Sequence, residues 1–306
     1  MKTVLITGAT GFLGSHLLRY LHAHTRFRFV VLKRTFSSTG RISALLQSAR
    51  IRYYDVDVVT VGEVFSSNHI DIVIHCATRY GREGEKNSSC YNILETNLMF
   101  PVSILEAASA AGTQLFINTD SYFNKDGLSY THLLNYSLSK RSLALWLKFF
   151  SGKMKVVNMM LEHIFGEDDS MSKFVPKLFD AIMIKQCLSV DLTPGEQRRD
   201  FIYVEDVCEA YKIVILYSLR SKFRFRQFDI GTGNAISIRE LANIMKRISR
   251  SQTELRFGAI PYRRDEIMLS EADPIELEGI GFCPKFTVER ALRKMYRKGR
   301  TAEMVW

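Results

Sequence analysis

Short apolar runs alternate with amphipathic stretches along the first half of the chain. These runs are rich in valine, isoleucine and leucine and cover residues 2–7, 29–32, 51–54, 71–77 and 114–117. Apolar residues at helical spacing follow the first run, and a long helical pattern at 92–111 separates the fourth run from the fifth. The run at 71–77 is almost wholly apolar, which is typical of a parallel strand buried on both faces. The pattern therefore predicts an α/β fold with a doubly wound parallel sheet.

The second half of the chain is less regular. It predicts a sixth strand at 155–160, a helix at 174–185, a short strand at 188–190, helices at 204–219 and 236–248, a return to the sheet at 228–233 and a last helix at 286–296. Ser237 and Glu240 form a capping-box pattern at the start of the helix at 236–248. The change in pattern predicts a first domain at 1–165 and a smaller α/β region at 166–306, with segments near 200–235 returning to the sheet.

Composition and charge narrow the possible functions. The 306 residues are 46% hydrophobic, and 42 Lys and Arg against 32 Asp and Glu give a net charge of +10. This excess suits an anionic ligand such as a dinucleotide or a sugar nucleotide, and it also suits nucleic acid or an acidic membrane surface. No stretch approaches the ~20 apolar residues of a membrane span, so membrane insertion is not expected. The basic residues form no long block outside 290–300, and we expect no nucleic-acid partner.

The five cysteines are scattered, and none forms a Cys-x-x-Cys pair. This argues against a disulfide framework or a zinc site and favours a cytoplasmic location. His75 and His163 lie beside apolar strands, where histidines commonly serve as core or cleft residues, so no metal site is expected. His163 ends a strand and remains a candidate for contact with a ligand.

A glycine-rich loop follows the first predicted strand. Gly8, Gly11 and Gly14 are spaced Gly-x-x-Gly-x-x-Gly, and an amphipathic helical pattern follows them. Glycines in this context allow a tight turn and let the backbone approach a pyrophosphate, while the amides of the helix N-terminus face its charge. The loop predicts a dinucleotide site in a Rossmann-type domain, with a plain strand-to-helix turn as the alternative.

Two cations end the second predicted strand. Sites that prefer NAD usually place an acidic residue there to hold the ribose hydroxyls, but this chain has Lys33 and Arg34. Cations suit a 2′-phosphate, so NADP(H) is favoured over NAD, and the alternative is a pair of exposed charges. Asp55 ends the third strand, where an adenine amino group would lie.

Tyr136 and Lys140 are one helical turn apart, which places both side chains on one helix face. A nearby ammonium group favours the phenolate and should lower the pKa of the phenol, so that it can exchange a proton with a sugar oxygen. The alternative is a solvated helix face.

The glycine loop, Thr119 and the Tyr-x-x-x-Lys pair together resemble the extended short-chain dehydrogenase/reductase family, the NAD(P)-dependent epimerases, dehydratases and reductases of nucleotide sugars. The resemblance covers nearly the whole chain, including the segments at 161–166, 195–207 and 231–233. It implies that Tyr136 donates a proton to the sugar oxygen, that Lys140 holds the nicotinamide ribose, and that Thr119 bonds the same sugar oxygen.

The resemblance also implies two sets of binding residues. The cofactor set comprises Gly8, Gly11, Phe12, Leu13, Gly14, Lys33, Arg34, Asp55, Val56, Cys76, Ala77, Thr78, Asn97, Tyr136, Lys140 and Leu161. The substrate set comprises Tyr80, Asp120, Ser121, His163, Phe174, Val175, Arg199, Arg263 and Glu266. Arg199 and Arg263 would clamp the pyrophosphate of a sugar nucleotide, because a guanidinium group can bond two phosphate oxygens.

A narrower resemblance rests on the segments at 118–123, 161–163, 193–197, 257–260 and 265–268. They are similar to a subgroup of this family, the CDP-abequose and CDP-paratose synthases, which reduce the 4-keto group of a CDP-3,6-dideoxyhexulose with NADPH in bacterial O-antigen (lipopolysaccharide) synthesis. Family members that dehydrate a hexose commonly carry Thr-Asp-Glu, whereas this chain has Thr119-Asp120-Ser121 and lacks the carbon base. We therefore expect a cytoplasmic, homodimeric NADPH-dependent 4-ketoreductase of a nucleotide sugar. The alternatives are an epimerase that retains NAD and a non-catalytic NADP(H)-binding regulator.

Overall fold

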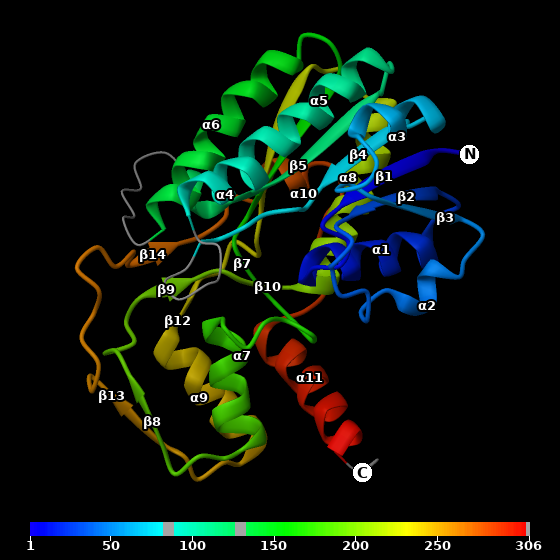
Figure 1. The fold of residues 1–306 in the computed structure, drawn as a ribbon. Helices are drawn as coiled ribbons and strands as arrows, with labels where there is room; N and C mark the ends of the chain where they lie inside the picture. The colour runs from blue at the N-terminus through cyan, green and yellow to red at the C-terminus, as the bar shows by residue number, and fades with distance from the viewer. Residues whose placement is uncertain (82–88, 126–132, 304–306) are drawn as a thin grey trace. The chain divides into compact units, whose positions relative to one another are not determined.

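The computed structural model describes residues 1–81, 89–125 and 133–303. Over these residues, a seven-stranded sheet has the order β11-β6-β5-β4-β1-β2-β3 (Figure 1). Its strands are β1 (Thr3–Thr7), β2 (Arg28–Lys33), β3 (Ile51–Asp55), β4 (Ile72–His75), β5 (Leu115–Ser121), β6 (Lys155–Leu161) and β11 (Phe225–Ile230). From β3 through β6, neighbouring strands all pair in parallel. The strand order reverses direction between β1 and β4, and ligands bind at such a switch point in open α/β sheets. The predicted fold class is confirmed.

Helices accompany these strands. They are α1 (Phe12–His24), α2 (Ser43–Leu46), α3 (Val61–Ser67), α4 (Cys90–Leu94), α5 (Phe100–Ala110), α6 (Leu134–Phe150) and α8 (Val204–Arg220). The long helix predicted at 92–111 is interrupted, because a π-helical turn, η1 (Glu95–Met99), lies between α4 and α5. The apolar pattern of that segment does not reveal the turn, since the backbone stays helical on both sides.

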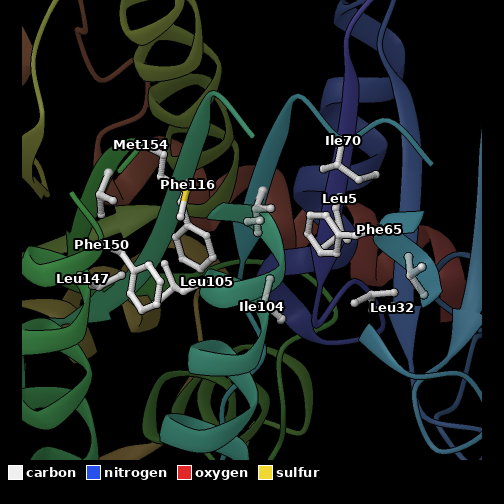
Figure 2. Packing of buried hydrophobic residues seen from close by; sticks show 14 of the residues in the cluster. Leu5, Leu32, Phe65, Ile70, Ile104, Leu105, Phe116, Leu147, Phe150 and Met154 are labelled. Atoms are coloured by element: carbon white, nitrogen blue, oxygen red, sulfur yellow. The ribbon is translucent and has the colours of Figure 1, made fainter. Parts of the chain in front are cut away.

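The core on one face of the sheet is a row of apolar side chains at a single register level. Leu5 lies opposite Val73, Val73 opposite Phe116, and Phe116 opposite Val156. This row belongs to a buried cluster with residues of α5 and α6, including Ile104, Leu105, Leu147 and Phe150 (Figure 2). Two residues further along the same strands, the row becomes polar, with Thr7, His75, Asn118 and Asn158 all almost fully buried. The change from apolar to polar marks the carboxyl-terminal edge of the sheet, where the candidate site lies.

The chain divides into two compact units. The first unit comprises Met1–Leu161 and Cys208–Phe228, and the second comprises Glu162–Val207 and Asp229–Trp306. Small sheets form the second unit's β structure: β7 (His163–Phe165) pairs with β10 (Phe201–Tyr203), β8 (Ser189–Leu192) with β13 (Glu254–Phe257), and β9 (Arg198–Arg199) lies between β12 (Ile236–Ser237) and β14 (Leu269–Ser270).

The helices of the second unit are α7 (Phe174–Phe179) with the following π-helical turn η3 (Asp180–Ile184), α9 (Ile238–Ser249), α10 (Ile275–Glu278) and α11 (Val288–Glu303). The predicted capping box of α9 is confirmed, since Ser237 and Glu240 each bond the other's backbone N–H. The last helix runs to Glu303, past the predicted end at 296. Within the described residues, no helix combines the length and apolar character needed to cross a bilayer.

Candidate nucleotide-binding and catalytic site

The glycine loop joins the end of β1 to α1 in the first unit. Gly8 has φ +67, and a Cβ built there would lie 2.6 Å from the backbone nitrogen of Ala77. A Cβ on Gly14 would lie 2.2 Å from the carbonyl oxygen of Gly8. Gly11 donates its N–H to that same oxygen at 2.9 Å. Gly8 and Gly14 are therefore required by close backbone packing between the loop, the first turn of α1 and the end of β4.

The N-terminus of α1 fits an anionic ligand. Its N-cap is Gly11, which provides no side-chain cap, and its first turn contains no acidic residue. The first N–H groups of a helix carry partial positive charge and need an acceptor, which a pyrophosphate supplies. The residues present thus fit the diphosphate of a dinucleotide, while each residue's predicted role in cofactor binding remains a prediction.

The two predicted 2′-phosphate cations are held by neighbouring side chains. Lys33 and Asp55 are register partners on β2 and β3, and the Lys33 ammonium bonds the Asp55 carboxylate. The Lys33 side chain is only 9% exposed, so the alternative of an exposed charge is wrong for this residue. Arg34 donates from Nη2 to the Thr96 hydroxyl at 3.0 Å. Asp55, which was expected near an adenine, is engaged by Lys33 because the parallel register places the two ends side by side.

Asn97 lies in the π-helical turn η1 and is almost fully buried. Its Oδ1 accepts from the Arg79 N–H at 2.8 Å and from the Thr78 hydroxyl at 3.3 Å. Its Nδ2 donates to the Arg79 carbonyl at 2.9 Å and to the Ser139 hydroxyl at 3.0 Å. Asn97 therefore ties the segment after β4 to α6, the helix that carries the tyrosine and lysine.

Tyr136 and Lys140 are both buried, so the alternative of a solvated helix face is wrong. The Lys140 Nζ donates to the carbonyl oxygen of Thr119 at 2.7 Å and lies 5.8 Å from the centroid of the Tyr136 ring. The ring of Tyr80 stacks on Tyr136 at 4.9 Å. The predicted placement of the pair on one helix face is thus confirmed, with Lys140 joining α6 to the end of β5.

The expected pKa of the phenol is wrong in direction. Burial raises the pKa of Tyr136 well above its usual value, and Tyr80 and Asp120 add to this shift, while a hydrogen bond with the Ser121 side chain opposes it. Burial also lowers the pKa of Lys140, against the attraction of Asp120. Desolvation is the largest cause of the raised Tyr136 pKa, so the phenol stays protonated.

Thr119 has two hydroxyl contacts that the sequence analysis did not foresee. Its Oγ1 lies 2.7 Å from the Tyr211 hydroxyl of α8 and donates to the Cys76 sulfur at 3.3 Å. Burial raises the pKa of the Cys76 thiol to about 11, which keeps it protonated. Tyr211 was missed because it lies on the apolar face of α8, where an aromatic residue usually indicates core packing.

Asp120 is held by three donors. The Ser121 N–H bonds Oδ1 at 2.8 Å, and the side-chain amides of Asn124 and Asn158 both bond Oδ2 at 2.9 Å. Asn118 in turn donates to the Asn158 carbonyl oxygen at 2.7 Å. The carboxylate is therefore a fixed, buried negative charge near the Tyr136 and Lys140 pair.

His75 belongs to the same polar row. Its Nδ1 lies 2.9 Å from the Thr7 hydroxyl, and that hydroxyl also accepts the N–H of Ala77 at 3.2 Å. Burial, aided by repulsion from Lys140, lowers the pKa of His75 to about 3. The neutral ring thus helps to fix the end of β1 against the end of β4, beside the glycine loop.

In the second unit, three predicted substrate residues lie together. Arg199 is buried and forms an ion pair with Glu266 at 2.6 Å, and the Glu266 N–H bonds the Arg263 carbonyl at 3.2 Å.

The Nδ1 of His163 lies 3.7 Å from Glu162, and burial lowers the pKa of this histidine. Phe174 and Val175 begin α7, where Phe174 is exposed. The substrate roles of these residues remain predictions.

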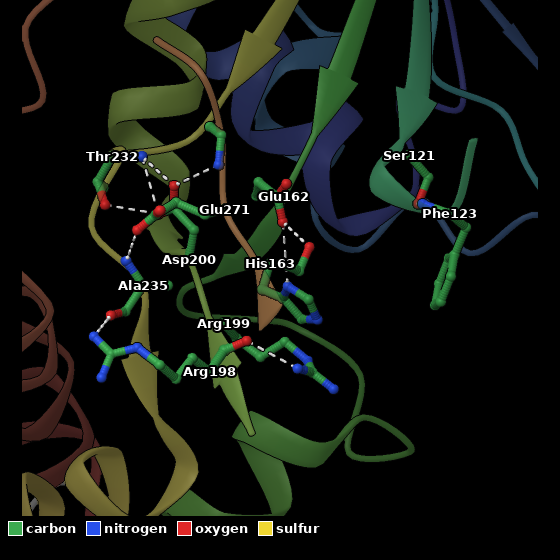
Figure 3. Close-up of polar contacts among 12 residues, drawn as sticks. Ser121, Phe123, Glu162, His163, Arg198, Arg199, Asp200, Thr232, Ala235 and Glu271 are labelled. Carbon is green, nitrogen blue, oxygen red and sulfur yellow. Dashed lines mark hydrogen bonds and ion pairs between the residues drawn. The ribbon is translucent and has the colours of Figure 1, made fainter. Parts of the chain in front are cut away.

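The sequence analysis did not single out Asp200, which connects three segments of the second unit. Its carboxylate accepts from the backbone N–H groups of Thr232, Gly233 and Ala272 and from the Thr232 hydroxyl (Figure 3). Gly231 packs so close that a Cβ there would lie 2.3 Å from an Asp200 oxygen. Since Asp200 follows Arg199 directly, this network holds the backbone that presents the arginine.

The fold and site define a class of protein, and comparison with known proteins agrees. Residues 4–231 match the model of the NAD dependent epimerase/dehydratase family, and the chain belongs to that family. A CDP-abequose synthase from Salmonella muenchen is 33% identical over 96% of this chain and 97% of that protein. A CDP-abequose synthase from Yersinia pseudotuberculosis is 25% identical over 87% of this chain and 90% of that protein. The predicted resemblance is confirmed.

Solved structures show the same fold at low sequence identity. A UDP-glucose-4-epimerase from Stenotrophomonas maltophila, with bound NAD and formylated UDP-arabinopyranose, has a TM-score of 0.85 at 19% identity and covers 100% of both chains. MoeE5 in complex with UDP-glucose and NAD has a TM-score of 0.80 at 21% identity and covers 98% of this chain and 99% of that one.

Proposed function

We propose that this chain is an NADPH-dependent reductase that acts on the C4 keto group of a nucleotide-linked 4-keto-6-deoxy- or 3,6-dideoxyhexose, with CDP as the nucleotide. The observation that carries the proposal is the 33% identity to CDP-abequose synthases over 96% of the chain. A cytoplasmic role in making a deoxysugar of a bacterial surface polysaccharide follows from the same similarity. The buried Tyr136 and Lys140 pair agrees with catalysis.

In this proposal the cofactor and the residues of the chain have separate roles in the reduction. The nicotinamide cofactor, when bound, supplies the hydride that reduces the ketone. Tyr136 Oη donates the proton that the sugar oxygen needs, because its raised pKa keeps it protonated. Lys140 holds the end of β5 through the Thr119 carbonyl and places a positive charge beside the tyrosine, which stabilises the phenolate left after transfer. Ser121 stands where dehydratases commonly carry a glutamate, so a carbon base is missing from that position.

NADPH is proposed over NADH because Lys33 and Arg34 end β2. Lys33 is paired with Asp55 and Arg34 with Thr96, so both cations are anchored rather than mobile. A 2′-phosphate at this position would add a second anionic partner to an existing cation. Anchored cations lose less side-chain entropy on binding, which strengthens each phosphate contact.

An NAD-retaining epimerase is the second candidate, because the chain belongs to a family that includes NAD-dependent epimerases. A non-catalytic NADP(H)-binding regulator is disfavoured by the buried and connected Tyr136 and Lys140.

One experiment separates the three functions. The purified chain is incubated with CDP-, dTDP-, UDP- or GDP-linked 4-keto sugars and NADPH, and both the NADPH absorbance and the product sugar are followed. One NADPH consumed per product formed supports the reductase. Conversion of a nucleotide sugar without net NADPH consumption indicates the epimerase, and NADPH binding without any product indicates the regulator.

We further propose that the protein is a homodimer whose interface is formed by α6 together with the adjacent α4 and η1. Large apolar side chains on α6 and on the adjacent α4 and η1 are exposed: Leu134, Leu138, Leu145, Trp146, Phe149, Tyr91, Leu94 and Met99. A second copy presenting the same two-helix face would cover this surface with a self-complementary partner. Light scattering should give twice the chain mass, and replacing both Leu145 and Phe149 by Glu should give a monomer. A monomeric unmodified protein at micromolar concentration would contradict this assignment.

A further inference from the structure

Three polar side chains of the first unit meet at the Thr119 hydroxyl. Cys76 follows β4, Thr119 lies in β5, and Tyr211 comes from α8, a helix far away in the sequence. The Thr119 hydroxyl is the centre, with the Tyr211 hydroxyl at 2.7 Å and the Cys76 sulfur at 3.3 Å. Tyr211 is completely buried, whereas Thr119 is partly exposed. Thr119 is therefore more accessible to a ligand than Tyr211.

The donor and acceptor roles of the hydroxyl groups in this cluster can be assigned. A threonine hydroxyl has one hydrogen to donate and two lone pairs that accept. When the Thr119 hydrogen is donated to the Cys76 sulfur, the 2.7 Å contact between the two hydroxyls is made by the hydrogen of Tyr211. Burial, with added repulsion from Cys76, raises the pKa of Tyr211 well above its usual value, so this phenol keeps its hydrogen at any working pH. Tyr211 is therefore a permanent donor to Thr119.

We propose that Tyr211 is a positioning residue. It donates a hydrogen bond to the Thr119 hydroxyl, which leaves the hydrogen of that hydroxyl to be donated to the C4 oxygen of the sugar. The inference rests on the proposed ketone reduction. Sulfur is a weak acceptor, so the Thr119 hydrogen can leave Cys76 for a sugar oxygen that is gaining negative charge. Tyr211 keeps donating throughout, which polarises the Thr119 hydroxyl and makes it a stronger donor.

A double-mutant cycle tests this chain of hydrogen bonds. Tyr211→Phe removes one oxygen and keeps the ring, and we expect kcat to fall about 5- to 10-fold, the value of one net hydrogen bond near its upper range. The KM for NADPH should stay within about twofold, because the contact does not involve the glycine loop. In a Thr119→Val background, where no hydroxyl remains to be oriented, Tyr211→Phe should lower kcat by less than about twofold.

Tyr217→Phe is the matched control. Tyr217 lies on the same helix, and its ring packs on Phe223 and Phe228. This variant also loses one tyrosine hydroxyl oxygen from α8, but away from Thr119, so its kcat should equal that of the unmodified protein. A general weakening of α8 would instead lower the activity of both variants.

Two results would overturn the inference. One is an unchanged kcat in Tyr211→Phe, and the other is an equal loss with and without the Thr119 hydroxyl, which would mean that Tyr211 acts independently of Thr119. The same four proteins should also be compared by urea unfolding, which needs no substrate. If unfolding shows coupling but no 4-keto sugar is reduced by the unmodified chain, the proposed function has failed and the catalytic role of Tyr211 falls with it. Reduction of the sugar without coupling in kcat overturns the role of Tyr211 alone.

Discussion

Replacing Gly14 by Ala should weaken cofactor binding strongly while the rest of the fold is kept. The new Cβ would lie 2.2 Å from the Gly8 carbonyl oxygen and 2.9 Å from the Ala9 Cα, whereas ordinary contacts begin at 3.4 Å. Relief of the shorter contact needs a movement of 3.4 − 2.2 = 1.2 Å between two backbone segments. Forcing extra atoms into a packed site typically costs about 1–3 kcal/mol, and here neither neighbour is a flexible side chain.

The movement would separate the loop from the first turn of α1, and these two segments form the surface that we propose binds the diphosphate. We expect the Kd for NADPH to rise at least about 100-fold, because amide groups displaced by about 1 Å no longer meet the same oxygens. Binding is measured by the fluorescence of NADPH, and the melting temperature is recorded for each variant.

Substitutions at two other glycines serve as controls for the Gly14→Ala variant. Gly11→Ala meets only the Gly8 oxygen, at 3.2 Å, and should weaken binding much less. Gly62→Ala, in α3, has nothing within 4 Å and should leave binding unchanged and stability equal or up to about 1 kcal/mol higher. Equal NADPH affinity in Gly14→Ala and the unmodified protein would refute the assignment of this loop, and so would a Gly11→Ala variant that is worse than Gly14→Ala.

Three further predictions concern the chemistry, the cofactor and pH. Tyr136→Phe should lower kcat about 10²- to 10⁴-fold with NADPH affinity kept, as expected for loss of a general acid, and steady-state kinetics would expose a mere binding role if KM alone changed. Lys33→Ser should raise the Kd for NADPH about 10- to 100-fold but that for NADH little; equal losses of affinity for both cofactors would reject a 2′-phosphate site. Below pH 6.5 the unfolded chain protonates His75 while the folded chain does so only near pH 3, so the free energy of unfolding should fall by about 1.4 kcal/mol per pH unit over this window. His75→Gln should remove the contribution of this one protonation to the pH dependence of the unfolding free energy, measured by urea unfolding at several pH values. An unchanged pH dependence would contradict the buried neutral ring.

The sequence predicted the sheet and the helices well because their signals are local. The β-branched runs became β1 to β6, and the capping pattern at Ser237 and Glu240 formed as expected. The break in the helix at 92–111 could not be predicted, because the π-helical turn around Asn97 depends on the partners that this side chain finds on Arg79 and Ser139. Those partners lie outside the helix, and no spacing within it reveals them.

By itself, the sequence determined the family, the glycine loop and the Tyr136 and Lys140 pair, because each is a short pattern whose residues act within one or two turns of backbone. Only the tertiary structure decided the electrostatics and the partners. Lys140 was expected to lower the pKa of Tyr136, but burial by surrounding elements raises it. Tyr211 lies 92 residues from Thr119 in the chain, yet their hydroxyls are 2.7 Å apart. Desolvation and long-range contacts depend on how distant segments pack, so they enter only when the strands and helices are assembled.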